Sequence, residues 1–235
     1  QTCALPISRS ASPRTALGLM GSPRWTDSDV AGSRHGDEMA RALRRSRRLP
    51  LTFDVTALRR DLACVGADDW SPVPVLGVEA AIPDWTGSAL RSHDGSITSV
   101  GYQGTQYHDT PLLERAPYFA KVTRFFACET RRVRLLTLHP GAEIGTHRDA
   151  LEEDGVEVVR IHVPITTNAR VSFLVDGQAL RLLPGEVWFV DVSRPHSVAN
   201  HGETPRVHLV LDCVVNEWVN TLLTSEAHAE PTPSI

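Results

Sequence analysis

The spacing of hydrophobic and polar residues changes along the chain and divides it into three parts. Residues 1–48 show no sustained periodicity and are rich in Ser, Arg, Gly and Pro, which predicts a disordered leader. From residue 49 to residue 225 the pattern is that of a globular domain, and residues 226–235 are expected to form a loose tail. The 235 residues are therefore expected to contain one folded domain rather than two.

The first part of this domain combines two predicted helices with two short strands. Thr56 can cap a helix that extends to Val65, because hydroxyl side chains are common at helix N-termini. Apolar residues at helical spacing predict a second amphipathic helix over residues 112–126. Short strands are predicted at residues 51–55 and 85–90, and a turn signal follows the second one.

Beyond residue 132 the hydrophobic period becomes two, which is typical of strands whose side chains alternate between two faces. Asp176-Gly177 and Pro184-Gly185 supply turns between these strands. Because the strands follow one another without intervening helices, the pattern favours antiparallel pairing in a sandwich or a jelly roll. The predicted strands are residues 133–138, 158–165, 171–175, 178–183, 186–192 and 206–215, followed by a short helix at 217–223.

The overall composition argues against several classes of function. A formal net charge of -4 gives no reason to expect a nucleic-acid partner. The sequence contains no apolar run of membrane-spanning length, and its beginning lacks the pattern of a secretory signal. The four cysteines, at positions 3, 64, 128 and 213, form no zinc-binding pattern and are expected to be reduced thiols in a cytoplasmic protein.

Six of the ten histidines lie between positions 139 and 208, in the strand-rich part, and suggest a metal site. On an extended chain His147 and Asp149 point the same way, and His196 follows later. Two imidazoles and one carboxylate leave three positions of an iron ion open, whereas a structural zinc site closes its shell with four protein ligands. The same His-x-Asp spacing at residues 35–37 shows that the motif is weak without this context.

Arg206 is the candidate partner of an anion beside that metal. If residues 196–206 form a hairpin, His196 and Arg206 lie opposite each other with Cβ atoms about 5 Å apart. A carboxylate matches the planar fork of a guanidinium, and 2-oxoglutarate offers one while its keto-acid end chelates iron. His201 and His208 are the rivals of His196; His201 is placed in the turn, and His208 shares a face with Arg206 and could support a ligand.

Taken in order, the motifs of the strand-rich region resemble those of the aspartyl/asparaginyl β-hydroxylase family, whose bacterial relatives include proline cis-4-hydroxylases. The resemblance covers residues 85–215. It rests on the segments His139-Pro140-Gly141, Thr146-His147-Arg148-Asp149, Arg160 to Ile165, Pro184 to Phe189, Ser193 to Ser197 and Pro205 to Val210. Together these segments are far more specific than any one of them alone.

The resemblance implies a mainly β, cupin-like jelly roll, the double-stranded β-helix, with flanking N-terminal helices. It implies Fe(II) as the metal, with His147, Asp149 and His196 as its ligands, and 2-oxoglutarate and O2 as co-substrates. It places Arg206 on the distal carboxylate of 2-oxoglutarate. The expected reaction is hydroxylation of an unactivated C–H bond, with release of succinate and CO2.

The remaining candidate residues are expected around this centre. The resemblance suggests that Arg160 and His162 line the co-substrate or substrate pocket, and pairing with structural carboxylates is the alternative for both. Arg91, which follows the predicted strand 85–90, is a candidate for holding a substrate carboxylate. The expected substrate is a free amino acid or an Asp/Asn-type residue of a peptide, because arginines at the barrel mouth favour a carboxylate.

Two other classes of function stay open at this point. One is a non-catalytic, cupin-like domain that binds a metal or a ligand. The other is a cupin-type enzyme that does not use 2-oxoglutarate. Replacement of Arg206 by alanine separates them from the first hypothesis, since only a 2-oxoglutarate enzyme loses its co-substrate dependence.

Overall fold

A computed structural model of the chain describes residues 45–74, 82, 84–101, 104–150, 152–153 and 155–225. The predicted loose tail and all but the last four residues of the predicted leader lie outside the described residues. The first described strand, β1, begins at Arg47. No helix within the described ranges is long and apolar enough to cross a membrane.

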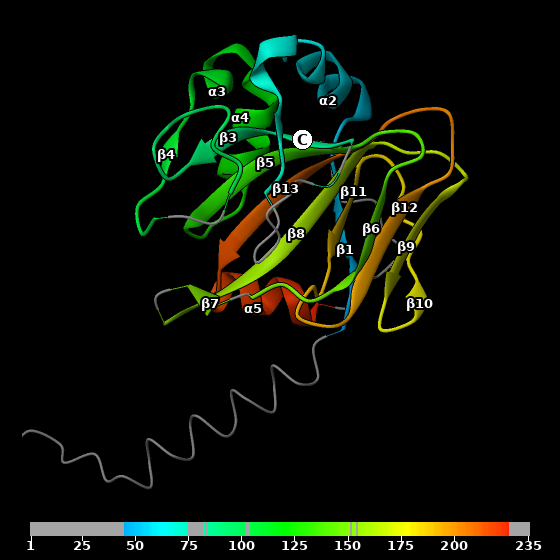
Figure 1. The fold of residues 1–235 in the computed structure, drawn as a ribbon. Helices are drawn as coiled ribbons and strands as arrows, with labels where there is room; N and C mark the ends of the chain where they lie inside the picture. The colour runs from blue at the N-terminus through cyan, green and yellow to red at the C-terminus, as the bar shows by residue number, and fades with distance from the viewer. Residues whose placement is uncertain are drawn as a thin grey trace, which may run out of the picture. The chain divides into compact units, whose positions relative to one another are not determined.

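Two antiparallel sheets face each other and build the domain (Figure 1). The large sheet has the order β1 (Arg47–Thr52), β11 (Glu186–Phe189), β8 (Val156–Thr166), β13 (Arg206–Val214), β5 (Thr130–Leu138), β3 (Trp85–Ser92) and β2 (Ser71–Pro72). The two-residue strands β4 (His108–Asp109) and β7 (Glu152–Glu153) pair with β3 and β8. The small sheet has the order β10 (Gln178–Ala179), β9 (Val171–Val175), β12 (His196–Asn200) and β6 (Glu143–His147).

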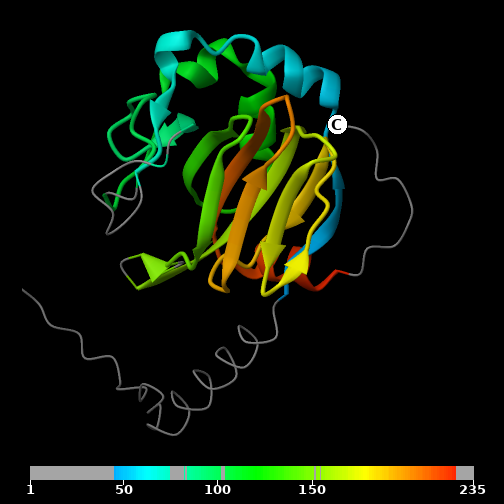
Figure 2. The same cartoon turned by 45° about the vertical axis from the view of Figure 1, so that its right-hand side comes forward.

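Successive strands of the second half alternate between these two sheets, which is the topology of a double-stranded β-helix. From β5 the chain passes to β6 in the small sheet, returns to β8, and crosses again to β9 and β10. Figure 2 shows the small sheet lying across the large one. The predicted mainly β jelly roll is therefore confirmed.

The large sheet has one apolar face and one polar face. On β13, Leu209 and Leu211 belong to a core that also contains residues of the helices. Because side chains alternate along a strand, Arg206, His208 and Asp212 point away from the helices and toward the small sheet. All five residues are buried, so the polar ones must find their partners inside the barrel.

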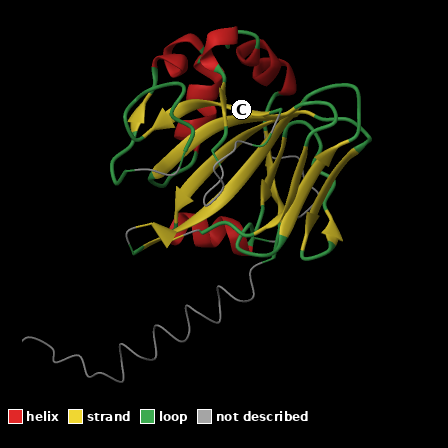
Figure 3. Ribbon diagram, viewed as in Figure 1, coloured by secondary structure: helices red, strands yellow, loops and turns green. Residues whose placement is uncertain are grey.

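The helices cover the apolar face of the large sheet, and Figure 3 shows helices gathered on one side. They are α2 (Val55–Leu62), α3 (Pro111–Arg115) and α4 (Pro117–Phe125), and α5 (Glu217–Thr224) follows the last strand. A short 3-10 turn, η1 (Ala67–Asp69), follows α2. The buried carboxylate of Asp61 on α2 accepts hydrogen bonds from the backbone N–H groups of Tyr118 and Phe119, so it caps α4 from a neighbouring helix.

Two details of the helices differ from the sequence prediction. The cap of α2 is Asp54 rather than Thr56, because the Asp54 carboxylate accepts a 2.8 Å hydrogen bond from the N–H of Thr56. The helix expected over residues 112–126 is divided at Ala116. Pro117 has no N–H to donate and its ring excludes the helical conformation from the residue before it.

The expected hairpin of residues 196–206 was wrong. β12 pairs with β6 and β9 of the small sheet, and β13 pairs with β5 and β8 of the large one. His196 therefore lies opposite His147, and Arg206 lies opposite Leu138. Residues 201–205 connect the small sheet to the large one. The alternation of polar and apolar residues is the same whether the next strand pairs with its neighbour or joins the other sheet, so the sequence could not reveal this connection.

Candidate metal centre

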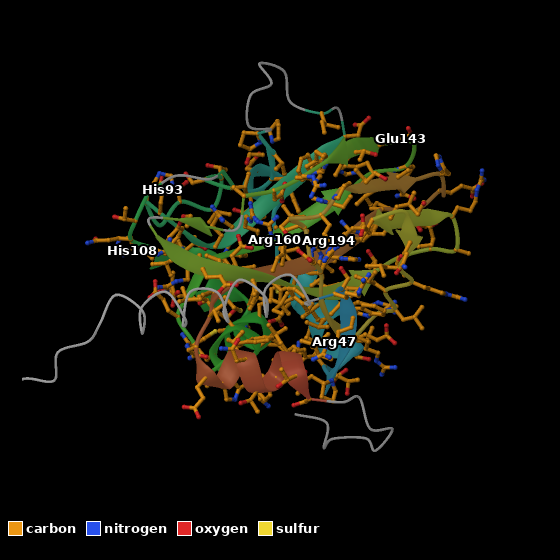
Figure 4. All side chains as sticks on the ribbon, turned by 90° about the horizontal axis from the view of Figure 1, so that it is seen from below. Arg47, His93, His108, Glu143, Arg160 and Arg194 are labelled. Atoms are coloured by element: carbon orange, nitrogen blue, oxygen red, sulfur yellow. The ribbon has the colours of Figure 1, made fainter. Side chains whose placement is uncertain are left out.

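The space between the two sheets is a cavity into which strands of both sheets direct polar side chains. We call it the inner cavity. Figure 4 labels Arg160 near the middle of the domain, whereas His93 and His108 lie at its edge. The lining residues are Trp85, Arg134, Leu136, Ile144, His147, Asp149, Arg160, His162, Phe173, Val192, His196, Val198 and Arg206. Six of the seven candidate site residues thus share one cavity.

His147, Asp149 and His196 come together at one end of the small sheet. His147 ends β6, His196 begins β12, and the two residues face each other across the strands. The centroids of the two imidazole rings are 4.1 Å apart, and Nε2 of His147 lies 3.3 Å from Oδ1 of Asp149. The potential ligand atoms of all three residues lie within 4.8 Å of one another, as one bound ion requires.

The backbone orients both imidazoles for metal binding. Nδ1 of His147 donates a hydrogen bond to the Gly145 carbonyl at 2.8 Å, and Nδ1 of His196 donates to the Arg194 carbonyl at 3.0 Å. Since a carbonyl oxygen only accepts, the proton of each neutral ring resides on Nδ1. Nε2 of each ring is then the atom that can bind a metal ion, which is the usual arrangement of a histidine ligand; in His147 this atom interacts with Oδ1 of Asp149.

Asp149 is held in position and in its ionised form. Its N–H donates to the Val192 carbonyl at 2.8 Å, which ties the chain after β6 to the chain before β12. Burial alone would raise the pKa of the Asp149 carboxyl. The hydrogen bond from His147 and the positive charge of Arg160 outweigh burial and hold that pKa well below its usual value. An ionised carboxylate therefore stands beside the Nε2 atoms of the two imidazoles.

The two imidazoles respond differently to their surroundings. The hydrogen bond with Asp149 raises the pKa of His147, whereas burial lowers the pKa of His196. His196 is only 5 % exposed and so favours the neutral ring, the form that binds a metal. The pair is thus suited to hold a cation, which would replace the proton on His147.

Arg206 is a buried cation without a carboxylate partner among the described residues. Its side chain contacts Nδ1 of His208 at 2.8 Å and lies over the ring of Phe173, and its Nε has no hydrogen-bond acceptor. Burial lowers the pKa of Arg206 to about 9, so the guanidinium stays charged at neutral pH. A buried, unpaired charge is costly, so this position fits an anionic ligand that enters the inner cavity.

Arg160 and His162 share the inner cavity but have different partners. Nε of Arg160 donates to Oδ1 of Asp212 at 2.7 Å, and its NH1 nitrogen contacts Asp149. The Nδ1 atoms of His162 and His208 lie 3.2 Å apart, and Nε2 of His162 has no partner in the described part of the chain. Burial lowers the pKa of both histidines well below the usual value, so both are neutral.

The sequence prediction missed the carboxylate on which the arginines converge. Asp212 is completely buried, and Arg132, Arg134 and Arg160 all contact it. Asp212 lies directly opposite Arg160 in the pairing of β13 with β8. A signal was present in the sequence, because Arg132 and Arg134 share one face of β5 at a spacing of two.

Arg91 lies elsewhere. It is on β3, where its guanidinium pairs with Asp109 at 2.5 Å and donates to the Tyr107 carbonyl at 2.7 Å. Its Nε donates to the Thr130 carbonyl at 2.9 Å. Arg91 is not among the residues that line the inner cavity, so its assignment to a substrate carboxylate stays a prediction.

Comparisons with known proteins relate the chain to one family. The family model described as aspartyl/asparaginyl beta-hydroxylase matches residues 77–215. Over 155 residues the chain is 30 % identical to the L-proline cis-4-hydroxylase of Rhizobium meliloti (strain 1021), a match that covers 62 % of this chain and 55 % of the relative. The chain thus spans little more than half the length of that relative.

Solved structures show more distant likenesses. An oxidoreductase of the 2OG-Fe(II) oxygenase family from Burkholderia pseudomallei has a TM-score of 0.47 and 19 % identity, covering 68 % of this chain and 78 % of that one. A prolyl-4-hydroxylase of Pseudomonas putida also has a TM-score of 0.47, with 14 % identity over 74 % of this chain and 95 % of that one. Likenesses this distant carry no information about activity. The match of the family model spans more than half of the chain, and the protein therefore belongs to the aspartyl/asparaginyl β-hydroxylase family.

Proposed function

We propose that the protein is an Fe(II)- and 2-oxoglutarate-dependent hydroxylase that acts on a small amino acid or on an Asp/Asn-type residue. One observation carries this proposal. A three-residue set of metal ligands and a buried guanidinium without a carboxylate line the same cavity. A metal ion alone would leave the guanidinium uncompensated, whereas a dicarboxylic acid that also binds the metal satisfies both.

The protein's own residues would hold the two groups. His147, Asp149 and His196 supply two nitrogen atoms and one oxygen atom for iron, which leaves positions for a co-substrate and O2. Iron held there would allow O2 to act as the oxidant, with one oxygen atom entering the C–H bond of the substrate and the other entering the succinate that forms from 2-oxoglutarate as CO2 is released. The protein contributes orientation and the exclusion of water, since the centre lies between two sheets.

Arg206 would bind the distal carboxylate of 2-oxoglutarate. Along β13, Asp212 lies opposite Arg160 near the metal ligands, and Arg206 lies toward the other end of the same face. This order lets one linear molecule reach both the metal and the guanidinium. His162, whose Nε2 has no partner among the described residues, and Arg160 would line the same co-substrate space. The contact of Arg160 with Asp149 gives it the further role of orienting that ligand.

The family and the relative define the candidates for the substrate. The relative's name states that it acts on L-proline, and the family is described by aspartyl and asparaginyl residues. We therefore propose a small-molecule amino acid or a peptide as the partner of this site. Arg91 stays a candidate for a substrate carboxylate only if Asp109 releases it, because the two side chains are paired.

The test is succinate formation by the purified protein. We expect succinate only when Fe(II), 2-oxoglutarate and O2 are all supplied, with ascorbate to keep the iron reduced. Arg206→Ala should abolish it, because Arg206 is the one arginine among the described residues of the inner cavity that is not already paired with a carboxylate. Arg115→Ala is the matched control, since Arg115 is exposed and pairs with Asp69 outside the cavity. Equal activity of both variants would rule out the proposed role of Arg206, and metal-independent turnover would rule out the function.

A further inference from the structure

Two cysteines come together where the chain leaves α4 and passes β13. Cys128 lies in the bend between α4 and β5, and Cys213 lies on β13 opposite Thr130 of β5. The N–H of Val214 donates a 2.9 Å hydrogen bond to the Glu129 carbonyl, so the residues that follow the two cysteines are joined directly. Cys128 also packs against the apolar core that contains Cys213. The backbone thus holds two thiols close together on segments that are far apart in the sequence.

The two thiols differ in their access to solvent. Cys213 is completely buried, whereas Cys128 is only half-buried. A small oxidant dissolved in water can therefore reach the sulfur atom of Cys128, while the core shields that of Cys213. Redox-sensitive cysteines are commonly accessible thiols that stand next to a second cysteine, and this pair has the same arrangement.

The contact between the two thiols also makes Cys128 the more reactive one. Hydrogen bonding from the Cys213 thiol lowers the pKa of Cys128 and outweighs burial and the charge of Glu129, which both raise that pKa. The same contact, together with burial, raises the pKa of Cys213 well above its usual value. Because the thiolate rather than the thiol attacks an oxidant, Cys128 is expected to react first.

We propose that Cys128 is a site of reversible oxidation by hydroperoxides, and that Cys213 converts the first product into a disulfide within the same chain. In the first step the Cys128 sulfur bonds to one oxygen atom of hydrogen peroxide, the O–O bond breaks, and a sulfenic acid and water are formed. In the second step the Cys213 sulfur bonds to the Cys128 sulfur, the S–O bond breaks, and a second water molecule leaves. Two thiols thus lose two electrons and two protons, and the peroxide is reduced to two molecules of water.

Cys213 makes the oxidation of Cys128 reversible. A sulfenic acid without a thiol beside it is oxidised further to a sulfinic acid, which thiol reductants do not restore. Because Cys213 is held next to Cys128, the second step is intramolecular and competes with this further oxidation. The disulfide returns to two thiols when a reductant is supplied. Neither cysteine lines the inner cavity, so this chemistry is independent of the proposed function.

Peptide mapping after oxidation tests the disulfide. The full chain is reduced, freed of reductant and treated with a small excess of hydrogen peroxide, and a chelator keeps iron from reacting with the peroxide. Free thiols are then blocked with iodoacetamide, which prevents exchange. Because Arg131 and Arg206 lie between the two cysteines, trypsin places Cys128 and Cys213 in different peptides. We expect mass spectrometry to find these peptides joined, and dithiothreitol to separate them. A Cys128 that stays a free thiol, or that is joined to another cysteine, would overturn the proposal.

Cys213→Ala tests the role of the buried thiol. Without Cys213, prolonged treatment with peroxide should carry Cys128 to the sulfinic acid, seen as a gain of two oxygen atoms that dithiothreitol does not reverse. Cys64→Ser is the matched control, since Cys64 is an exposed cysteine whose thiol donates to the Arg60 carbonyl. This control should form the Cys128–Cys213 disulfide as the unaltered protein does. Full recovery of the Cys128 thiol in Cys213→Ala would contradict the role of Cys213.

Cys128→Ser keeps the proposal testable if Cys213→Ala does not fold, because it alters only the half-buried position. Circular dichroism shows whether each variant is folded. In Cys128→Ser the buried Cys213 should stay a free thiol after peroxide treatment, because the cysteine through which oxidation begins is gone. Loss of the Cys213 thiol in folded Cys128→Ser as fast as in the unaltered protein would show that Cys128 is not where the peroxide reacts.

Discussion

Replacement of the buried carboxylate by an amide, Asp212→Asn, should cost the protein much of its stability. Asp212 is completely buried and balances the charges of Arg132, Arg134 and Arg160. Removing one partner of a buried ion pair costs about 3–5 kcal/mol, because the remaining charge stays desolvated. Since about 1 kcal/mol shifts the midpoint of a domain of this size by roughly 2–4 °C, the melting temperature should fall by roughly 6–20 °C.

Thermal and urea unfolding, followed by circular dichroism, measure this loss. Asp109→Asn is the matched control, because Asp109 is an exposed carboxylate with one arginine partner and should cost less than about 1 kcal/mol. Asp212→Asn should also weaken Fe(II) binding, because Arg160 connects Asp212 to Asp149. A loss of stability in Asp212→Asn no larger than that in Asp109→Asn would refute the view that this carboxylate balances the arginines.

Three further predictions concern stability. Burial alone would raise the pKa of Asp212, but Arg160, Arg132 and Arg134 hold it well below its usual value. The ionised Asp212 side chain therefore stabilises the fold fully above about pH 3.9, the pKa of an Asp in the unfolded chain, and this contribution is lost as the pH falls further. The free energy of unfolding of Asp212→Asn should consequently depend less on pH in the acid range. In urea titrations, Gly185→Ala should lower the free energy of unfolding more than Gly177→Ala does. Both glycines have a positive φ, so the two variants share that strain. A Cβ at Gly185 would lie 2.7 Å from the Phe53 carbonyl oxygen, whereas a Cβ at Gly177 would meet open space. Asp61→Ala should cost about 1–3 kcal/mol in the same assay, because two buried N–H groups of α4 lose their acceptor; a cost near zero would mean that water replaces the cap.

The sequence contained enough to predict the long strands of the large sheet and to single out the residues that come together as candidate metal ligands, but not the two-residue strands β2, β4 and β7. His147 and Asp149 were recognisable because an extended chain directs both side chains to the same face, and the structure confirms this proximity. Strand β6 (Glu143–His147) was not predicted, because it is short and half polar and has no hydrophobic pattern of its own. Its pairing with β12 is what brings His147 opposite His196, and such long-range pairing leaves no local signal.

The burial of the arginines around Asp212 could not be predicted from the sequence either. A period of two places Arg132 and Arg134 on one face of β5, but it does not say which face is buried. Only the packing of helices against the opposite face shows that these arginines point inward, toward Asp212. In contrast, Pro117 was a readable signal, and the division of the helix at Ala116 follows from local chemistry alone.

Anaerobic binding of 2-oxoglutarate to the Fe(II)-loaded protein requires the metal and the guanidinium to act on one molecule. We expect saturable binding that needs Fe(II), and a loss of affinity of at least about 30-fold in Arg206→Ala, since a charge-assisted contact in a buried site is lost. Arg115→Ala should bind as the unaltered protein does. Equal affinity in Arg206→Ala, or binding that does not depend on Fe(II), would show that the metal centre and Arg206 do not hold 2-oxoglutarate together.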